Sequence, residues 1–267
     1  MQQLGAHGRT ILRVTTAANE PVIVEVAVES ATGAAAAAAG GAQRLELCQA
    51  LDLGGLTPSP GLVAVVKAAV PLPVFVMIRP RPGDFLYDDG EFAAMRRDVE
   101  ALRRAGADGF VTGVLRADGE VHAPRLTELV AAAGGAPVTF HRAIDVAAAP
   151  ERALESLVTA GVARVLTSGQ ANTAAAGVVA IRRLVLAAAG RLVVMAGAGV
   201  RDGNVRELVA ATGVREVHLS AAVRVPSAMV FRRDGVVMGA TALPDEFSRR
   251  QTDADLVARV VAAVRGA

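Results

Sequence analysis

Aromatic residues and cysteine are both scarce in this 267-residue chain. Only 3% of its residues are aromatic, Trp is absent and Tyr87 is the single tyrosine. Valine, leucine, isoleucine and alanine must therefore fill the core, which suits closely packed β-branched strands. Because Cys48 is the only cysteine, no disulfide can form within the chain, and nothing points to an oxidising compartment.

Positive charge comes almost entirely from arginine, since Lys67 is the only lysine. The formal net charge is only +2, and acidic residues alternate with basic ones. No basic stretch is interleaved with aromatics, so we expect no nucleic-acid partner. Long apolar runs are also missing: all are broken by Arg or Gly well short of ~18 residues, so we expect no membrane span. Residues 1–20 lack the features of a signal peptide; they are predicted to be a flexible leader, and the expected location is cytoplasmic.

Short apolar runs recur along the chain, and each is followed by a stretch long enough for one crossover helix. This alternation is typical of parallel strands. Eight such units in about 250 residues predict a single (β/α)8 barrel of the TIM type over residues 21–267. The eight runs are 22–28, 44–48, 74–80, 109–115, 138–142, 164–169, 192–199 and 216–221. Asn204 is predicted to cap the seventh helix, with Glu207 in the capping-box position, and residues 221–250 are predicted to be an irregular extension.

Strand alternation predicts which side chains point into the barrel. The expected interior ring is much more polar than a packed core needs, so its members must pair with one another or bind a ligand. The ring comprises Glu25, Glu46, Cys48, Arg79, Thr112, His141, Thr167, His218 and Ser220. Pairs of Glu25 with Arg79 and of Glu46 with His218 could instead be purely structural. Cys48 alone could be a small buried hydrophobic residue.

Glycines follow two of the predicted strands and indicate an anion site. Gly197 and Gly199 follow the seventh strand, and Gly169 follows the sixth. Glycine there exposes backbone N–H groups to a phosphate in many barrels. Arg79 and Arg81 lie in a proline-rich loop and could bind a carboxylate or phosphate. Tight turns and a solvated, rigid loop are the structural alternatives.

Several of these motifs together resemble the CutC family of copper homeostasis proteins. They are RLELCQALDLGGLTPSPG, MIRPRPGDFLYDDGEF, VTGVL, VTFHRAID, RVLTSGQ, MAGAGVR and EVHLSA. The resemblance implies a cytoplasmic barrel, a homo-oligomer and copper binding. The family commonly has cysteine on the first strand, whereas this chain has Val26, Ala27 and Val28 there. A Cu(I) site from paired thiolates within one monomer is therefore ruled out, and the metal ligands implied are Cys48 with His218. His141, Met77 or Met195 are further candidates.

Two main functions remain open at this point, and a binding or scaffolding role without turnover is a third. The first is copper homeostasis, with Cu(I) bound through Cys48. The second is an enzyme of unassigned reaction on a small anionic or phosphorylated metabolite, with Glu25, Glu46 and His141 as acid–base candidates. Its predicted substrate-binding residues are Arg79, Arg81, Thr112, Thr167, Gly169, Gly197, Gly199 and Ser220. No nucleotide cofactor is expected.

Overall fold

The computed structural model describes residues 21–233, 235–236 and 246–265. The predicted leader, residues 1–20, lies outside the described part of the chain. Eight strands alternate with helices: β1 Ile23–Val28, α1 Ala31–Ala39, β2 Arg44–Leu47, α2 Pro60–Ala69, β3 Val74–Met77, α3 Asp89–Arg104, β4 Gly109–Thr112, α4 Ala123–Ala132, β5 Val138–Phe140, α5 Pro150–Ala160, β6 Arg164–Thr167, α6 Val178–Ala188, β7 Val193–Ala196, α7 Asp202–Thr212, β8 Glu216–Leu219 and α8 Ala254–Arg265. Two short 3-10 helices, Leu51–Leu53 and Arg142–Val146, follow β2 and β5.

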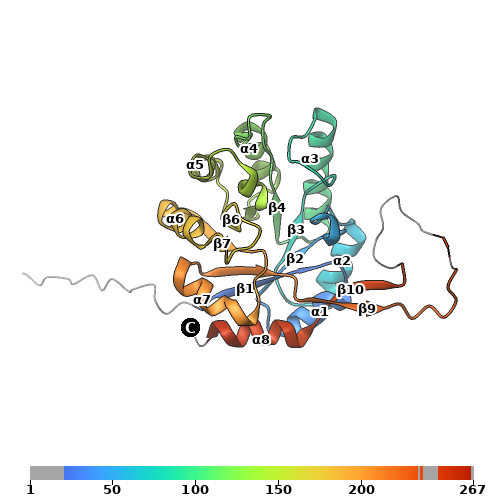
Figure 1. Ribbon diagram of the computed structural model, residues 1–267. Coiled ribbons are helices and arrows are strands. Elements are labelled where there is room, and N and C mark those ends of the chain that lie inside the picture. The colour runs from blue at the N-terminus through green and yellow to red at the C-terminus, as the bar shows by residue number, and fades with distance from the viewer. Residues whose placement is uncertain (1–20, 234, 237–245, 266–267) are drawn as a thin grey trace, which may run out of the picture.

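The strands form a closed parallel barrel in which each pairs with the next and β8 pairs with β1. The helices lie around the barrel on its outside (Figure 1). The predicted (β/α)8 barrel is confirmed. Strand register brings Glu25 level with Arg44 on one neighbouring strand and with His218 on the other. In a parallel sheet, side chains level with one another share a face, so these three meet inside the barrel.

The core between strands and helices is aliphatic. Val24 and Val26 on β1 and Leu45 and Leu47 on β2 are fully buried and face the helices. The alanine-rich α1 is capped by the Ser30 hydroxyl, which accepts a hydrogen bond from the Gly33 N–H. Small side chains let this helix pack closely on the sheet, and the high helix propensity of alanine stabilises it. The alanine run is thus part of the barrel wall.

Two local predictions are wrong. Helix α7 begins at Asp202, and Asn204 lies in its first turn, where the side-chain oxygen accepts from the Arg201 N–H at 2.9 Å. The amide side chain stabilises the helix start from inside the helix, and Arg201 takes the cap position. The extension after β8 is also more regular than predicted, because β9 (Ala222–Pro226) and β10 (Ser248–Thr252) form an antiparallel ribbon.

The ribbon lies beside α1 and brings late residues back to the barrel (Figure 1). Arg250 of β10 donates a hydrogen bond to the Ser220 hydroxyl, at 3.2 Å, just after β8. The segment beyond β9 has exposed apolar side chains, among them Val230 and Phe231. None of the helices in the described part of the chain has the length and apolar character needed to cross a membrane.

Candidate functional site

A buried network of charges occupies the barrel interior. The Arg44 guanidinium forms ion pairs with both Glu25 and Glu216, and Glu216 also pairs with Arg164 at 3.0 Å. The aromatic ring of Phe75 contacts the guanidiniums of both Arg44 and Arg164, whose carbons are 5.1 and 5.0 Å from its centroid. These ion pairs and cation–π contacts offset the loss of hydration that burial imposes on each charge.

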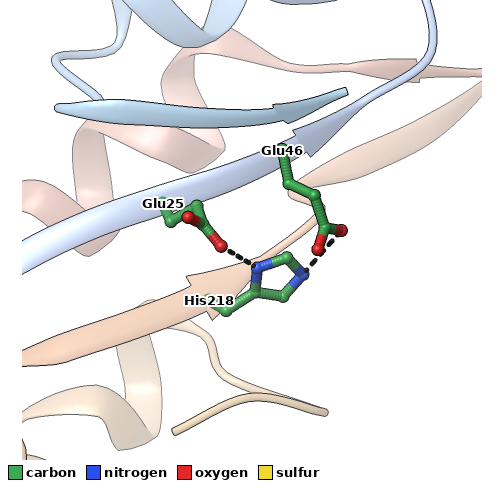
Figure 2. A group of neighbouring side chains, drawn as sticks. All are labelled: Glu25, Glu46 and His218. Carbon is green, nitrogen blue, oxygen red and sulfur yellow. Dashed lines mark hydrogen bonds and ion pairs between the residues drawn. The ribbon is translucent and has the colours of Figure 1, made fainter. Parts of the chain in front are cut away.

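Above this network, His218 lies between two carboxylates (Figure 2). Its Nδ1 is 2.8 Å from Glu25 Oε1, and its Nε2 is 3.6 Å from Glu46 Oε2. Glu25 and Glu46 each offer a carboxylate oxygen, and His218 offers a ring nitrogen, as possible metal ligands. These three atoms all lie within 4.8 Å of one another. The three side chains come from β8, β1 and β2, so barrel closure assembles the group.

The protonation states of this group follow from its surroundings. Burial alone would raise the pKa of Glu25, but the His218 hydrogen bond and the Arg44 charge outweigh it and lower the pKa to about 2. Burial opposes a charged imidazole, yet the carboxylates of Glu46 and Glu25 raise the pKa of His218. Burial raises the pKa of Glu46. Glu25 is therefore the fixed anion, while the pKa values of Glu46 and His218 are both shifted upwards from their ordinary values.

Cys48 lies directly beside Glu46. Its fully buried thiol donates to Glu46 Oε2 at 3.3 Å. Burial, followed by the neighbouring Glu46 charge, raises the pKa of Cys48 well above its usual value. The side chain packs with Phe75, Met77 and Val111 in a small apolar cluster. The thiol is therefore protonated in the metal-free protein and has a carboxylate within reach of its proton.

A cavity of about 480 Å³ opens above these residues at the carboxyl ends of the strands. This is the end of the barrel where active sites of such folds lie. Its lining includes Glu46 and His218 from the buried interior group. It also includes three arginines, one after β3, one after β5 and one on β10. The polar and glycine residues in the lining are Glu46, Gly54, Arg79, His141, Arg142, Gly199, His218, Ser220 and Arg250.

His141 contributes a neutral imidazole to this cavity. Its Nδ1 accepts a hydrogen bond from the Ala143 N–H at 3.1 Å, so the ring proton lies on Nε2, which has no partner. Burial, with the nearby Arg79 charge, lowers the pKa of His141 to about 3. A Cβ on Gly113 would lie 2.3 Å from this ring, so only glycine leaves it room. At neutral pH His141 is a hydrogen-bond donor and a poor proton acceptor.

Arg79 has mainly local partners. Its guanidinium donates to the carbonyl oxygens of Leu53, Gly55 and Gly83 and holds two loops together, while its Nε is unpaired. The side chain does not pair with Glu25, so that suggested structural pair is absent; Arg44 and His218 take its place. The suggested pair of Glu46 with His218 is present.

Asp145 organises the loop after β6. Its carboxylate accepts from the Thr167 hydroxyl at 2.5 Å, from the Ser168 N–H at 2.9 Å and from Arg142 Nε at 2.8 Å. Arg142 also donates to the Ser168 hydroxyl at 2.7 Å, which fixes its side chain at the cavity rim. One buried carboxylate thus positions both a loop and a cationic side chain.

The structure brings together some of the predicted site residues and not others. Glu46, Arg79, His141, Gly199, His218 and Ser220 line the cavity, and Glu25 and Cys48 adjoin Glu46 beneath it. Arg81 lies outside, where it pairs with Glu91 at 2.5 Å and stacks over Tyr87. Gly169 and Gly197 are also outside the lining, and close packing explains why both positions are glycine. An added Cβ would lie 2.4 Å from the Gly177 oxygen at position 169 and 2.6 Å from the Leu166 side chain at position 197.

The interior positions predicted for Thr112 and Thr167 are wrong. Val111 is level with Met77 and shares its apolar interior cluster, so Thr112 faces the helices, where its hydroxyl donates to the Ile78 oxygen at 3.2 Å. Thr167 likewise shares the outward face of Val165 and bonds Asp145. In both cases the hydroxyl has a hydrogen-bond acceptor on the outward side of the strand and needs no place in the interior.

Several site residues were missed by the sequence prediction. Arg44 has the same strand parity as Glu46, and Glu216 has the same parity as His218, so alternation alone could have identified both. Arg250 comes from β10, beyond the barrel strands, and no local pattern marks it.

Comparison with known proteins identifies relatives over most of the chain. Residues 22–223 match the CutC family. A family protein CutC from Chromobacterium violaceum is 49% identical over 235 residues, covering 88% of this chain and 95% of that protein. The copper homeostasis protein cutC homolog of Homo sapiens is 46% identical, covering 86% of this chain and 85% of that protein.

Solved structures agree in fold. A crystal structure of a CutC protein from Streptococcus agalactiae superposes with a TM-score of 0.71 at 30% identity, covering 74% of this chain and 97% of that one. A phosphoribosylanthranilate isomerase from Thermotoga maritima, with a TM-score of 0.54 at 13% identity, covers 92% of this chain and 100% of that one. At that identity the likeness concerns the barrel alone.

Proposed function

This chain belongs to the CutC family, and we propose that it is a copper homeostasis protein that binds Cu(I) through Cys48. One observation carries the proposal: the same Glu46 oxygen that accepts the Cys48 thiol proton lies 3.6 Å from His218 Nε2. The thiol and the imidazole, from two different strands, therefore both lie next to the same carboxylate oxygen.

The donor atoms near that oxygen suit a soft monovalent copper ion. Cu(I) prefers thiolate, thioether and imidazole ligands. Cys48 offers the thiolate, His218 the imidazole, and Met77 packs against Cys48 in the same apolar cluster. Glu25 holds the other imidazole nitrogen and so orients the ring, as carboxylates commonly do for histidine ligands.

Copper binding at this site must release protons. The pKa of Cys48 is raised by burial and by Glu46, and the pKa of His218 is raised by its two carboxylates. A protonated thiol or a protonated imidazole must lose a proton before it can donate an electron pair to the metal. Glu46 lies next to both and can accept the thiol proton on its way to the cavity. The affinity for Cu(I) should therefore fall as pH falls.

Titration of the purified protein with Cu(I), against a competing chelator, tests this assignment. Because Cys48 is the only cysteine, any thiolate-to-copper absorption band belongs to it. We expect Cys48→Ala to remove the band and His218→Asn to weaken binding at least about tenfold. His122→Asn and Met95→Leu are matched controls away from the site, in the α4 cap and in the core under α3. Unchanged affinity in Cys48→Ala would contradict the proposal.

Two further properties implied by the family resemblance belong to this proposal: a cytoplasmic location and a homo-oligomeric state. The exposed apolar side chains of Met229, Val230 and Phe231 support self-association. Light scattering after size exclusion should give a mass above that of one chain, and Val230→Ser with Phe231→Ser should reduce it. A wild-type monomer at micromolar concentration would exclude the homo-oligomer.

A further inference from the structure

The cavity has an excess of positive charge that a one-thiol copper site does not need. Arg79, Arg142 and Arg250 contribute three guanidiniums to its wall, and the only lining carboxylate among the described residues is Glu46, which is paired with His218. Arg142 and Arg250 also pair with Asp145 and Asp52, which lie outside the lining, whereas Arg79 donates to carbonyl oxygens. Cys48, in contrast, is not part of the lining. A cavity of this size and charge suits a small anionic molecule.

Backbone donors are exposed on one side of the cavity, in the loop between β7 and α7. Ala198 and Gly199 both have positive φ, 76° and 71°. Two hydrogen bonds to its carbonyl oxygens fix this loop. The Ala174 N–H donates to the Ala198 oxygen, and the Asn204 side-chain amide donates to the Gly199 oxygen, both at 2.9 Å. Among the described residues, no acceptor faces the N–H groups of Ala198, Gly199 or Val200. Unpaired successive N–H groups in such a turn form an anion-binding concavity.

A cationic side chain accompanies these donors. Arg250 reaches the cavity from β10; it is held by the Ser220 hydroxyl and by Asp52, both at 3.2 Å. Loops after the seventh and eighth strands are where phosphate sites of such barrels are built. The antiparallel ribbon thus places a guanidinium at that end of the barrel.

Three buried polar atoms in residues of the cavity wall have no partner: Arg79 Nε, Glu46 Oε1 and His141 Nε2. Two of them, Glu46 Oε1 and His141 Nε2, belong to residues that are only 3% and 5% exposed. Buried polar groups are nearly always hydrogen-bonded, so these two atoms call for a ligand. One accepts a hydrogen bond and the other donates one, as a hydroxyl or carbonyl group of a metabolite requires.

We propose that the cavity binds a small phosphorylated metabolite. The backbone N–H groups of residues 198–200 and the Arg250 guanidinium hold its phosphate, while Glu46 and His141 bond its oxygen substituents. The inference does not require Cys48, which is outside the cavity lining, although Glu46 and His218 border both proposed sites.

Inorganic phosphate is the probe for the anion end. In metal-free protein at constant ionic strength, with chloride as the reference anion, calorimetry and ³¹P line broadening should show saturable binding. Arg250→Gln should weaken it at least about tenfold, and Ser220→Ala by a smaller factor. Arg97→Gln, an exposed arginine on α3, is the matched control and should bind like the wild type.

Glycerol 3-phosphate is the probe for the rest of the cavity. It should bind more tightly than inorganic phosphate, and Glu46→Gln should reduce that difference. Both affinities should persist in Cys48→Ala, so that failure of the copper assignment leaves this test intact. Phosphate binding no stronger than chloride binding, or equal loss in the Arg250 and Arg97 variants, would overturn the proposal. Equal affinity for the two phosphates would refute the role of Glu46.

Discussion

Arg44 is the residue on which the interior charge network depends most. It is 6% exposed and forms ion pairs with Glu25 and Glu216. Arg44→Met keeps much of the side-chain volume and removes the charge. Glu216 would keep Arg164, and Glu25 would keep His218, but the interior would have one uncompensated negative charge.

The expected cost follows from that unpaired charge. Removing one partner of a buried ion pair typically costs about 3–5 kcal/mol. For a chain of this size, 1 kcal/mol shifts the melting temperature by roughly 2–4 °C, so the melting temperature should fall by roughly 6–20 °C. The loss should be smaller at acidic pH, because a protonated carboxyl no longer needs the arginine.

Thermal and urea unfolding at pH 7 and pH 3 would measure this effect, since the contribution of Glu25 is lost as pH falls from 4.5 towards 2. Arg97→Met removes an exposed arginine from α3 and should change stability by less than about 0.5 kcal/mol. If Arg44→Met unfolds with the wild-type midpoint at pH 7, the interior charges are not coupled as the structure indicates.

Three other perturbations have defined outcomes. The folded pKa of His141, about 3, lies below its ordinary value of 6.5, so the unfolded chain binds a proton there that the folded protein does not. The stability contributed by neutral His141 is therefore present above pH 6.5 and is lost as pH falls towards 3. Urea titrations between pH 4 and pH 6 give the slope of the unfolding free energy against pH. This slope should be about 1.4 kcal/mol per pH unit shallower in His141→Gln than in the wild type. Equal slopes would exclude a neutral, buried ring. Iodoacetamide should alkylate Cys48 at least about 100-fold more slowly in the native protein than in urea, because burial raises its pKa; similar rates would mean an accessible thiolate. Asp145→Ala should lower the unfolding free energy by about 3 kcal/mol in urea, since it leaves Ser168 and Arg142 without their acceptor, and a change below 1 kcal/mol would show that the loop does not need it.

The barrel could be predicted from the sequence because its signal is repeated. Each strand carries its own apolar run, and β-strand parity places Glu25, Glu46 and His218 on the interior face without any knowledge of the fold's details. Closure of the barrel then brings together residues as distant in sequence as Glu25 and His218.

The errors arise where a residue's partner is not local. Thr112 and Thr167 look like interior polar residues until strand register shows that each has a hydrogen-bond acceptor on the other face. Arg250 belongs to a ribbon whose two strands are separated by residues 227–247, and only tertiary pairing returns it to the cavity. The protonation of His141 depends on a backbone contact that no residue pattern encodes.

X-ray absorption spectroscopy of the copper-loaded protein tests the central claim most directly. One equivalent of Cu(I) in the wild type should show sulfur together with a histidine nitrogen in its first coordination sphere. The sulfur signal should weaken or vanish in Cys48→Ala, while the Met95→Leu spectrum should match that of the wild type. A copper centre surrounded only by oxygen and nitrogen, unchanged on removal of Cys48, would contradict the assignment of this cluster as the copper site.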